Sequence, residues 1–125
     1  MREIKFRGKD SFSGKWRYGA YIPTEFTQWK EPSIFDGHHR AEVDGETLGQ
    51  YTGCKDVDGE EIYEGDIIKR TLTPKICGQV IFGSSGWTVE CGSNEYEINY
   101  FGSVKVIGNV FDNPELLEAK NDDTD

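Results

Sequence analysis

Several residue patterns are missing from this sequence, and each absence narrows the class of protein. No apolar run approaches the ~20 residues that a transmembrane helix requires. The first residues alternate and are charged, so we expect neither a membrane span nor a secretory signal. The three cysteines, Cys54, Cys77 and Cys91, stand far apart without a C-x-x-C spacing. We therefore predict a reduced, cytoplasmic protein with free thiols, no metal site and no cofactor.

Positive charge is also scarce. The 125 residues include 14 Lys and Arg against 23 Asp and Glu, which gives a net charge of −9. This balance argues against a general nucleic-acid binder and against anionic membranes, because both require a basic surface. The charge is uneven, since residues 1–17 are rich in Lys and Arg and the acids gather in residues 42–66 and at the C-terminus. Basic and acidic lobes could attract each other, within or between chains, or simply form a solvated surface.

Long amphipathic helical runs are missing as well, and short alternating segments take their place. The chain has 15 Gly, seven Phe, six Tyr and three Trp, a composition typical of β structure with many turns. Alternation predicts an antiparallel hairpin over residues 1–22, with Trp16, Tyr18, Ala20 and Ile22 on one face. The strands expected further along the chain begin at Ile67 and then cover residues 76–82, 87–91, 95–101 and 104–110.

This spacing predicts a mainly β fold in two parts. Residues 1–45 form an N-terminal β-hairpin lobe, and residues 46–120 form a small SH3-like β-barrel with a short C-terminal helix. Residues 121–125 are expected to be a disordered tail. The segment from Pro23 to Asp44 has the weakest pattern, although residues 24–29 could form a strand.

The middle of the chain, residues 50–69, holds two turns rich in acids. Asp58-Gly59 is a strong hairpin signal, and Glu64-Gly65-Asp66 predicts a second turn in which the Asp66 carboxylate accepts turn amides. The same acids could hold a divalent ion, but the spacing from Asp56 does not match a calcium loop. Turn geometry alone explains these residues, so a metal-dependent hydrolase is the third of our three functional hypotheses.

Three blocks of sequence resemble a known family. They read MREIKFRGKD at the start, GQYTGCKDVDGEEIYEGDIIK in the middle and VIGNVFDNPELL near the end. In these blocks the chain is similar to the YopX family of small phage and prophage proteins, although Cys54 stands where an aliphatic residue is usual. The resemblance implies a β-rich fold, a tendency to self-assemble and a site of action in the host cytoplasm. It implies no catalytic residues.

The C-terminal helix is expected after Asn113 and Pro114, which are typical of a helix start. At about two turns it cannot be stable alone. Leu116 and Leu117 must therefore pack on the barrel or on a neighbouring chain.

No set of residues assembles a catalytic centre, so the sequence favours a non-enzymatic protein that self-associates and acts by protein–protein contact. Aromatic anchors dominate interface energetics. The candidate interface residues are Trp16, Tyr18, Trp29, Phe35, Leu116 and Leu117. The alternative is nucleic-acid binding, in which basic and aromatic residues of the N-terminal hairpin form a stacking surface. Its candidate contacts are Arg7, Lys15, Trp16 and Arg17.

Overall fold

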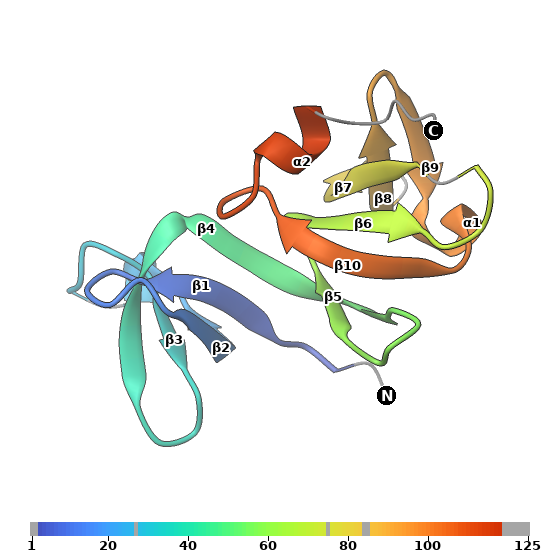
Figure 1. Cartoon of the computed structure of the whole chain (residues 1–125). Helices are drawn as coiled ribbons and strands as arrows, with labels where there is room; N and C mark the ends of the chain where they lie inside the picture. Colours follow the sequence, from blue (N-terminus) through green and yellow to red (C-terminus); the bar gives the residue numbers. More distant parts are fainter. Residues whose placement is uncertain (1–2, 27, 75, 84–85, 119–125) are drawn as a thin grey trace. The chain divides into compact units, whose positions relative to one another are not determined.

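The computed structural model describes residues 3–26, 28–74, 76–83 and 86–118. The chain divides into two compact units, Met1–Gly53 and Cys54–Asp125. Both are built mainly from antiparallel β-strands (Figure 1), so the predicted mainly β fold is confirmed. No helix in this described part of the chain has the length and apolar character that crossing a membrane requires.

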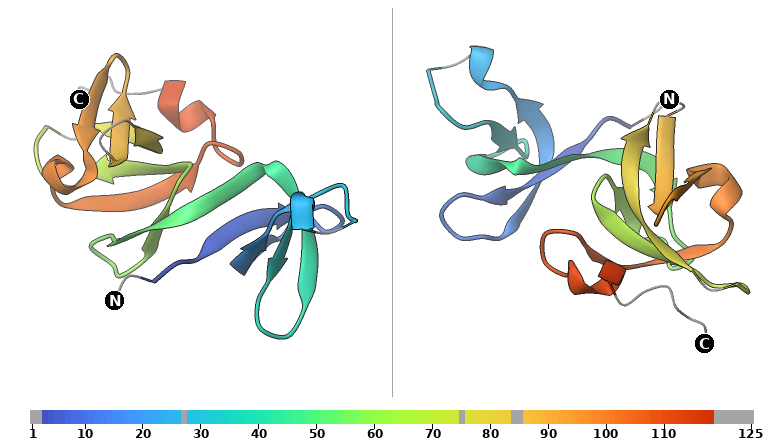
Figure 2. Two further views of the ribbon diagram at one scale, coloured as in Figure 1. Left: turned by 180° about the vertical axis from the view of Figure 1, so that it is seen from behind. Right: turned by 90° about the horizontal axis from the view of Figure 1, so that it is seen from above.

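In the first unit the strand pairing closes on itself, so that each of four strands pairs with two others. It contains β1 (Phe6–Asp10), β2 (Trp16–Ile22), β3 (Ser33–Phe35), most of β4 (Arg40–Lys55) and the 3-10 turn Thr24–Phe26. β1 pairs with β2, β2 with β3, β3 with β4, and β4 again with β1, all antiparallel (Figure 2). Such closure leaves little unpaired strand edge. Ile34 and Val43, 1% and 0% exposed, are the most deeply buried apolar side chains of this unit.

The second unit has the strand order of an SH3-like barrel. Its elements are β5 (Glu61–Tyr63), β6 (Asp66–Arg70), β7 (Cys77–Gly83), β8 (Gly86–Cys91), β9 (Asn94–Glu97), α1 (Ile98–Phe101), β10 (Val104–Asn109) and α2 (Glu115–Glu118). Five strands form a sheet in the order β10-β6-β7-β8-β9, with α1 between the last two strands in sequence. The core cluster contains Ile62, Ile68, Val80, Val89, Phe101 and Val104. The predicted barrel topology is therefore confirmed.

The chain divides into its two units at a different residue from the predicted boundary. We expected the division after residue 45, at the polar run Asp44-Gly45-Glu46. These residues instead lie inside β4, a single strand that continues to Lys55, and the units divide after Gly53. An exposed polar run can lie within a strand because its side chains face solvent there. The tail expected over 121–125 lies outside the described residues.

The strand predicted over residues 95–101 is wrong in its second half. β9 ends at Glu97, and Ile98–Phe101 form the helical turn α1. An extended segment would place Ile98 and Phe101 on opposite faces, whereas residues three apart in a helix share a face. Phe101 is 2% exposed and Ile98 packs against the same core cluster, while Tyr100 is 80% exposed. Burial of both side chains therefore favours the helical turn. Residues 24–29, a possible strand, begin instead with the 3-10 turn Thr24–Phe26.

Two acids of the central stretch, Asp56 and Asp66, accept backbone hydrogen bonds at the turns. Asp56 Oδ1 accepts hydrogen bonds from the backbone N–H groups of Asp58 and Glu60, at 2.8 and 2.9 Å, and its Oδ2 accepts one from Val106 at 2.9 Å. Asp66, 2% exposed, accepts a 2.7 Å hydrogen bond from the N–H of Tyr63. These carboxylates hold the two predicted turns, as turn geometry alone had indicated. The described residues contain no group of three metal-ligating side chains.

Candidate functional site

A surface pocket of about 390 Å³ lies in the first unit. Three segments form it: the turn between β1 and β2, the start of β2, and the β3–β4 hairpin. Its lining residues are Asp10, Phe12, Arg17, Tyr18, Ile34, Asp36, His39, Arg40, Ala41 and Glu42. Charged, aromatic and aliphatic side chains therefore converge on one site.

Two aspartates of the pocket hold turns. Asp10 Oδ1 accepts hydrogen bonds from the N–H groups of Phe12 and Ser13, at 2.8 and 3.1 Å. Its Oδ2 lies 2.9 Å from Nε and 2.8 Å from Nη2 of Arg17. These backbone donors, followed by Arg17, lower the pKa of Asp10 to about 2. Asp36 likewise accepts the N–H groups of both histidines, His38 and His39, which lowers its pKa.

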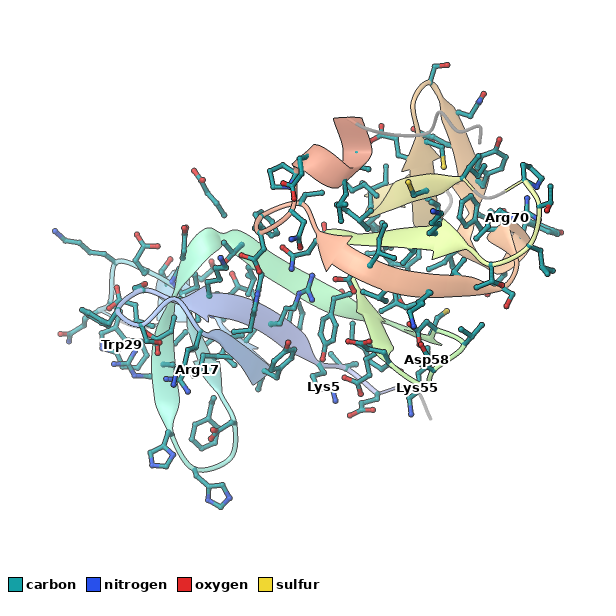
Figure 3. All side chains as sticks on the ribbon, in the orientation of Figure 1. Lys5, Arg17, Trp29, Lys55, Asp58 and Arg70 are labelled. Carbon is teal, nitrogen blue, oxygen red and sulfur yellow. The ribbon has the colours of Figure 1, made fainter. Side chains whose placement is uncertain are left out.

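Arg40 is the pocket's preorganised cation. Its Cζ lies 3.6 Å from the centroid of the Trp29 ring, and Nη1 donates a 2.7 Å hydrogen bond to Ser33 Oγ. Figure 3 shows Trp29 among the side chains of the first unit. Stacking and hydrogen bonding fix the plane of the guanidinium while the residue remains exposed. No carboxylate of the described residues forms an ion pair with Arg40.

Large aromatic side chains are exposed around this pocket. Phe12 is 86% exposed and Tyr18 45%, and both line the pocket. Trp29, 40% exposed, reaches the pocket through Arg40, and Phe35, 42% exposed, directly precedes the lining residue Asp36 in the β3–β4 hairpin. Sequence reasoning named Tyr18, Trp29 and Phe35 but missed Phe12. The sequence did contain a signal for Phe12, because it is the single aromatic residue in the polar turn Asp10-Ser11-Phe12-Ser13-Gly14.

The other candidate interface residues lie elsewhere. Trp16 is half-buried between Arg7 and Lys9, whose cationic groups lie 4.6 and 5.6 Å from its ring centroid. Leu116 and Leu117 belong to the second unit and are half-buried. Leu116 Cδ1 is only 3.0 Å from the place that a Cβ on Gly108 would take, so this leucine packs on its own barrel.

The basic residues proposed to contact nucleic acid are largely engaged within the protein. Arg7 is 6% exposed and stacks on Trp16. Arg17, labelled in Figure 3, is exposed but is held by Asp10. Lys15 is exposed. The structure brings these residues to one hairpin, but it leaves less free positive charge there than the sequence suggested.

The titration of Asp10 provides a direct check on the pocket's electrostatics. A carbon-13 NMR titration is expected to give a pKa of about 2 for Asp10 instead of the ordinary 3.8. Because the pKa is depressed, the stabilisation from this carboxylate is present above the ordinary pKa and is lost as the pH falls toward 2. Arg17→Ala should raise the pKa only in part, since the N–H donors of Phe12 and Ser13 are the larger causes. A folded-state pKa near 3.8 would contradict this geometry.

The fold and pocket define the class: a two-unit, mainly β protein with a surface pocket lined by charged and aromatic side chains. The family model described as YopX protein matches residues 5–118, and the chain belongs to the YopX family. No match was found among curated proteins. The chain is similar to a solved structure described as the crystal structure of protein EF1440 from Enterococcus faecalis, with a TM-score of 0.61 and 20% identity. The match covers 94% of this chain and 99% of that one, and at this identity it shows the fold alone.

Proposed function

We propose that this YopX-family protein is a non-enzymatic, self-associating protein of phage or prophage origin that acts by protein–protein contact in the host cytoplasm. The observation that carries the proposal is the exposed aromatic surface around the pocket: Phe12, Tyr18, Trp29 and Phe35, each at least 40% exposed. Trp, Tyr and Arg are the residue types that most often anchor interfaces. Here a Trp and an Arg are already stacked on each other.

The distribution of charge favours protein contact over nucleic-acid binding. Within the bounds of the first unit, 8 Lys and Arg balance 8 Asp and Glu, so the sum is 0. The second unit has 6 against 15, and 6 − 15 = −9 is the net charge of the whole chain. A neutral unit joined to a strongly acidic one supplies no net positive charge to drive counterion release from nucleic acid, which argues against that alternative.

The acids first considered as metal ligands also support a non-enzymatic reading. Asp56 and Asp66 accept backbone N–H groups, which commits their oxygen atoms to turns. The aspartates of the pocket are committed in the same way. These interactions give the acids a structural role that needs no reaction.

Removing exposed aromatic groups tests the proposal. Phe12→Ser and Phe35→Ser are each expected to weaken self-association about tenfold, because each removes an exposed anchor of about 1–2 kcal/mol. Sedimentation equilibrium measures the association constant. Val57→Ser is the matched control, since Val57 is an exposed apolar residue (53%) of the second unit that lies beside β10, at the other end of the sheet order from β9.

If the association constant falls equally in all three variants, or in none, the exposed aromatic surface is not the contact that drives self-association.

The same samples can be titrated with single-stranded and double-stranded DNA. Salt-dependent binding that is lost in Lys15→Ala would favour the nucleic-acid alternative instead.

A further inference from the structure

We infer that the pocket around Arg40 binds carboxylate groups supplied by a second copy of this chain, from Glu95 and Glu97 on the edge strand β9. This inference rests on the proposed self-association and names its electrostatic contact. Two observations carry it: an exposed, fixed guanidinium without an ion-pair partner among the described residues, and an open strand edge on which like charges face each other.

Arg40 has the geometry of a carboxylate receptor. Its stack on Trp29 and its hydrogen bond to Ser33 hold the guanidinium plane in place before any partner arrives. The hydrogen bond uses Nη1, so donors on Nε and Nη2 are left for an incoming group. A planar fork of this kind binds carboxylates in a bidentate manner, and fixing it beforehand lowers the entropic cost of binding.

The pocket's own carboxylates do not neutralise Arg40. Asp10 binds Arg17 and two backbone N–H groups, and Asp36 binds the N–H groups of His38 and His39. Glu42 also lines the pocket but forms no ion pair with Arg40. The positive charge of Arg40 is therefore available to a partner.

The β9 edge offers the complementary charge. β9 is the last strand in the sheet order, next to β8 (Figure 1). All four of its residues are exposed. Glu95 and Glu97 are two residues apart and so point to the same face. Glu95 lies directly opposite Glu90 of β8 in the register. Like charges directly opposite on an antiparallel pair are destabilising, so a cation docked at this edge would relieve repulsion.

The opposite edge of the sheet is already covered. At β10, the N–H of Val57 donates to the carbonyl of Val104, and the N–H of Val106 donates to Asp56. Lys105 of the same strand pairs with Asp58 at 2.7 Å. β9 is thus the other end of the sheet order, and no ion pair of Glu95 or Glu97 is formed within the part of the chain that the structure describes. A contact between different surfaces of two copies is heterologous, and it builds a ring or an open chain of subunits.

Charge reversal on each side, followed by the swap, tests the contact. Sedimentation equilibrium at low salt is performed on full-length protein for wild type, Arg40→Glu, the double variant Glu95→Lys/Glu97→Lys, and the combination of all three changes. Arg40→Glu alone and Glu95→Lys/Glu97→Lys alone are each expected to lower the association constant at least tenfold. The combination of all three changes is expected to restore the association constant to within about threefold of the wild-type value. Arg40→Lys should weaken association about threefold, since it keeps the charge but loses the fork.

Lys30→Glu is the matched control, because Lys30 is an exposed cation of the same unit that does not line the pocket. It should change association less than twofold. Thermal unfolding verifies that the variants are folded, which is expected because Arg40, Glu95 and Glu97 are all exposed.

The outcomes separate this inference from the proposed function. If wild type associates and Arg40→Glu associates equally well, the pocket is not the contact, while self-association stands. If both sides weaken association but the swap does not restore it, β9 is not the occupant. If wild type is monomeric at every concentration, the inference and the proposed function both fail.

Discussion

Replacement of Gly19 by alanine is expected to destabilise the first unit by about 4 kcal/mol. A Cβ at this position would lie 2.3 Å from the carbonyl oxygen of Phe35 and 2.9 Å from its carbonyl carbon. Both are backbone atoms of β3, which pairs with β2 at this point, so neither can move without breaking the pairing. The φ angle of +154° adds backbone strain for any residue with a side chain.

Urea denaturation followed by tryptophan fluorescence measures this effect. Gly45→Ala is the matched control, because its Cβ would make only an ordinary contact, 3.5 Å from Pro32, at an unstrained φ. We expect the control to lie within about 0.5 kcal/mol of wild type. A Gly19→Ala variant as stable as the control would show that β2 and β3 do not approach as closely as described.

Replacement of Asp56 by alanine is expected to destabilise the second unit by about 3 kcal/mol, because three backbone N–H groups would lose a charged acceptor. One of these bonds, from Val106, ties the turn to β10, 50 residues further along the chain. Burial raises the pKa of Asp56, but the N–H donors of Val106, Glu60 and Asp58 together outweigh burial and lower it. Its stabilisation is therefore present above the ordinary pKa of 3.8 and is lost as the pH falls through the lowered value.

Denaturation of Asp56→Ala at pH 7 and at pH 3 checks both parts of this prediction. The difference from wild type should shrink at the lower pH, because pH 3 lies below the ordinary pKa of 3.8, so the unfolded chain takes up a proton at Asp56 that the native carboxylate resists. Asp58→Ala is the control, since Asp58 is 55% exposed and its ion pair with Lys105 should contribute less than about 1 kcal/mol. Equal effects of the two substitutions would contradict the assigned role of Asp56.

Local sequence patterns were sufficient for most of the second unit. Alternation located β7 and β8, and Asp58-Gly59 located the turn between β4 and β5, because these signals depend on neighbouring residues. The helical turn α1 was not predicted, because the local sequence alternates partly and favours a strand. What favours the helical turn is the packing of Ile98 and Phe101 on a core formed by strands distant in the sequence.

The candidate site was harder to predict because its contacts join distant parts of the chain. Tyr18, Trp29 and Phe35 could be named as candidate interface residues because they are aromatic residues of the N-terminal lobe. The stack of Arg40 on Trp29 could not, since it depends on the path of a segment without clear periodicity. The burial of Arg7 was also hidden, because it follows from the pairing of β1 with both β2 and β4.

The solution mass of the full-length protein tests the central claim, self-association, most directly. It is measured by light scattering on a sizing column at low and at high salt. We predict a discrete oligomer larger than a dimer at low salt, and its dissociation at high salt, because the contact between Arg40 and the β9 carboxylates is screened. A monomer under both conditions would contradict the account.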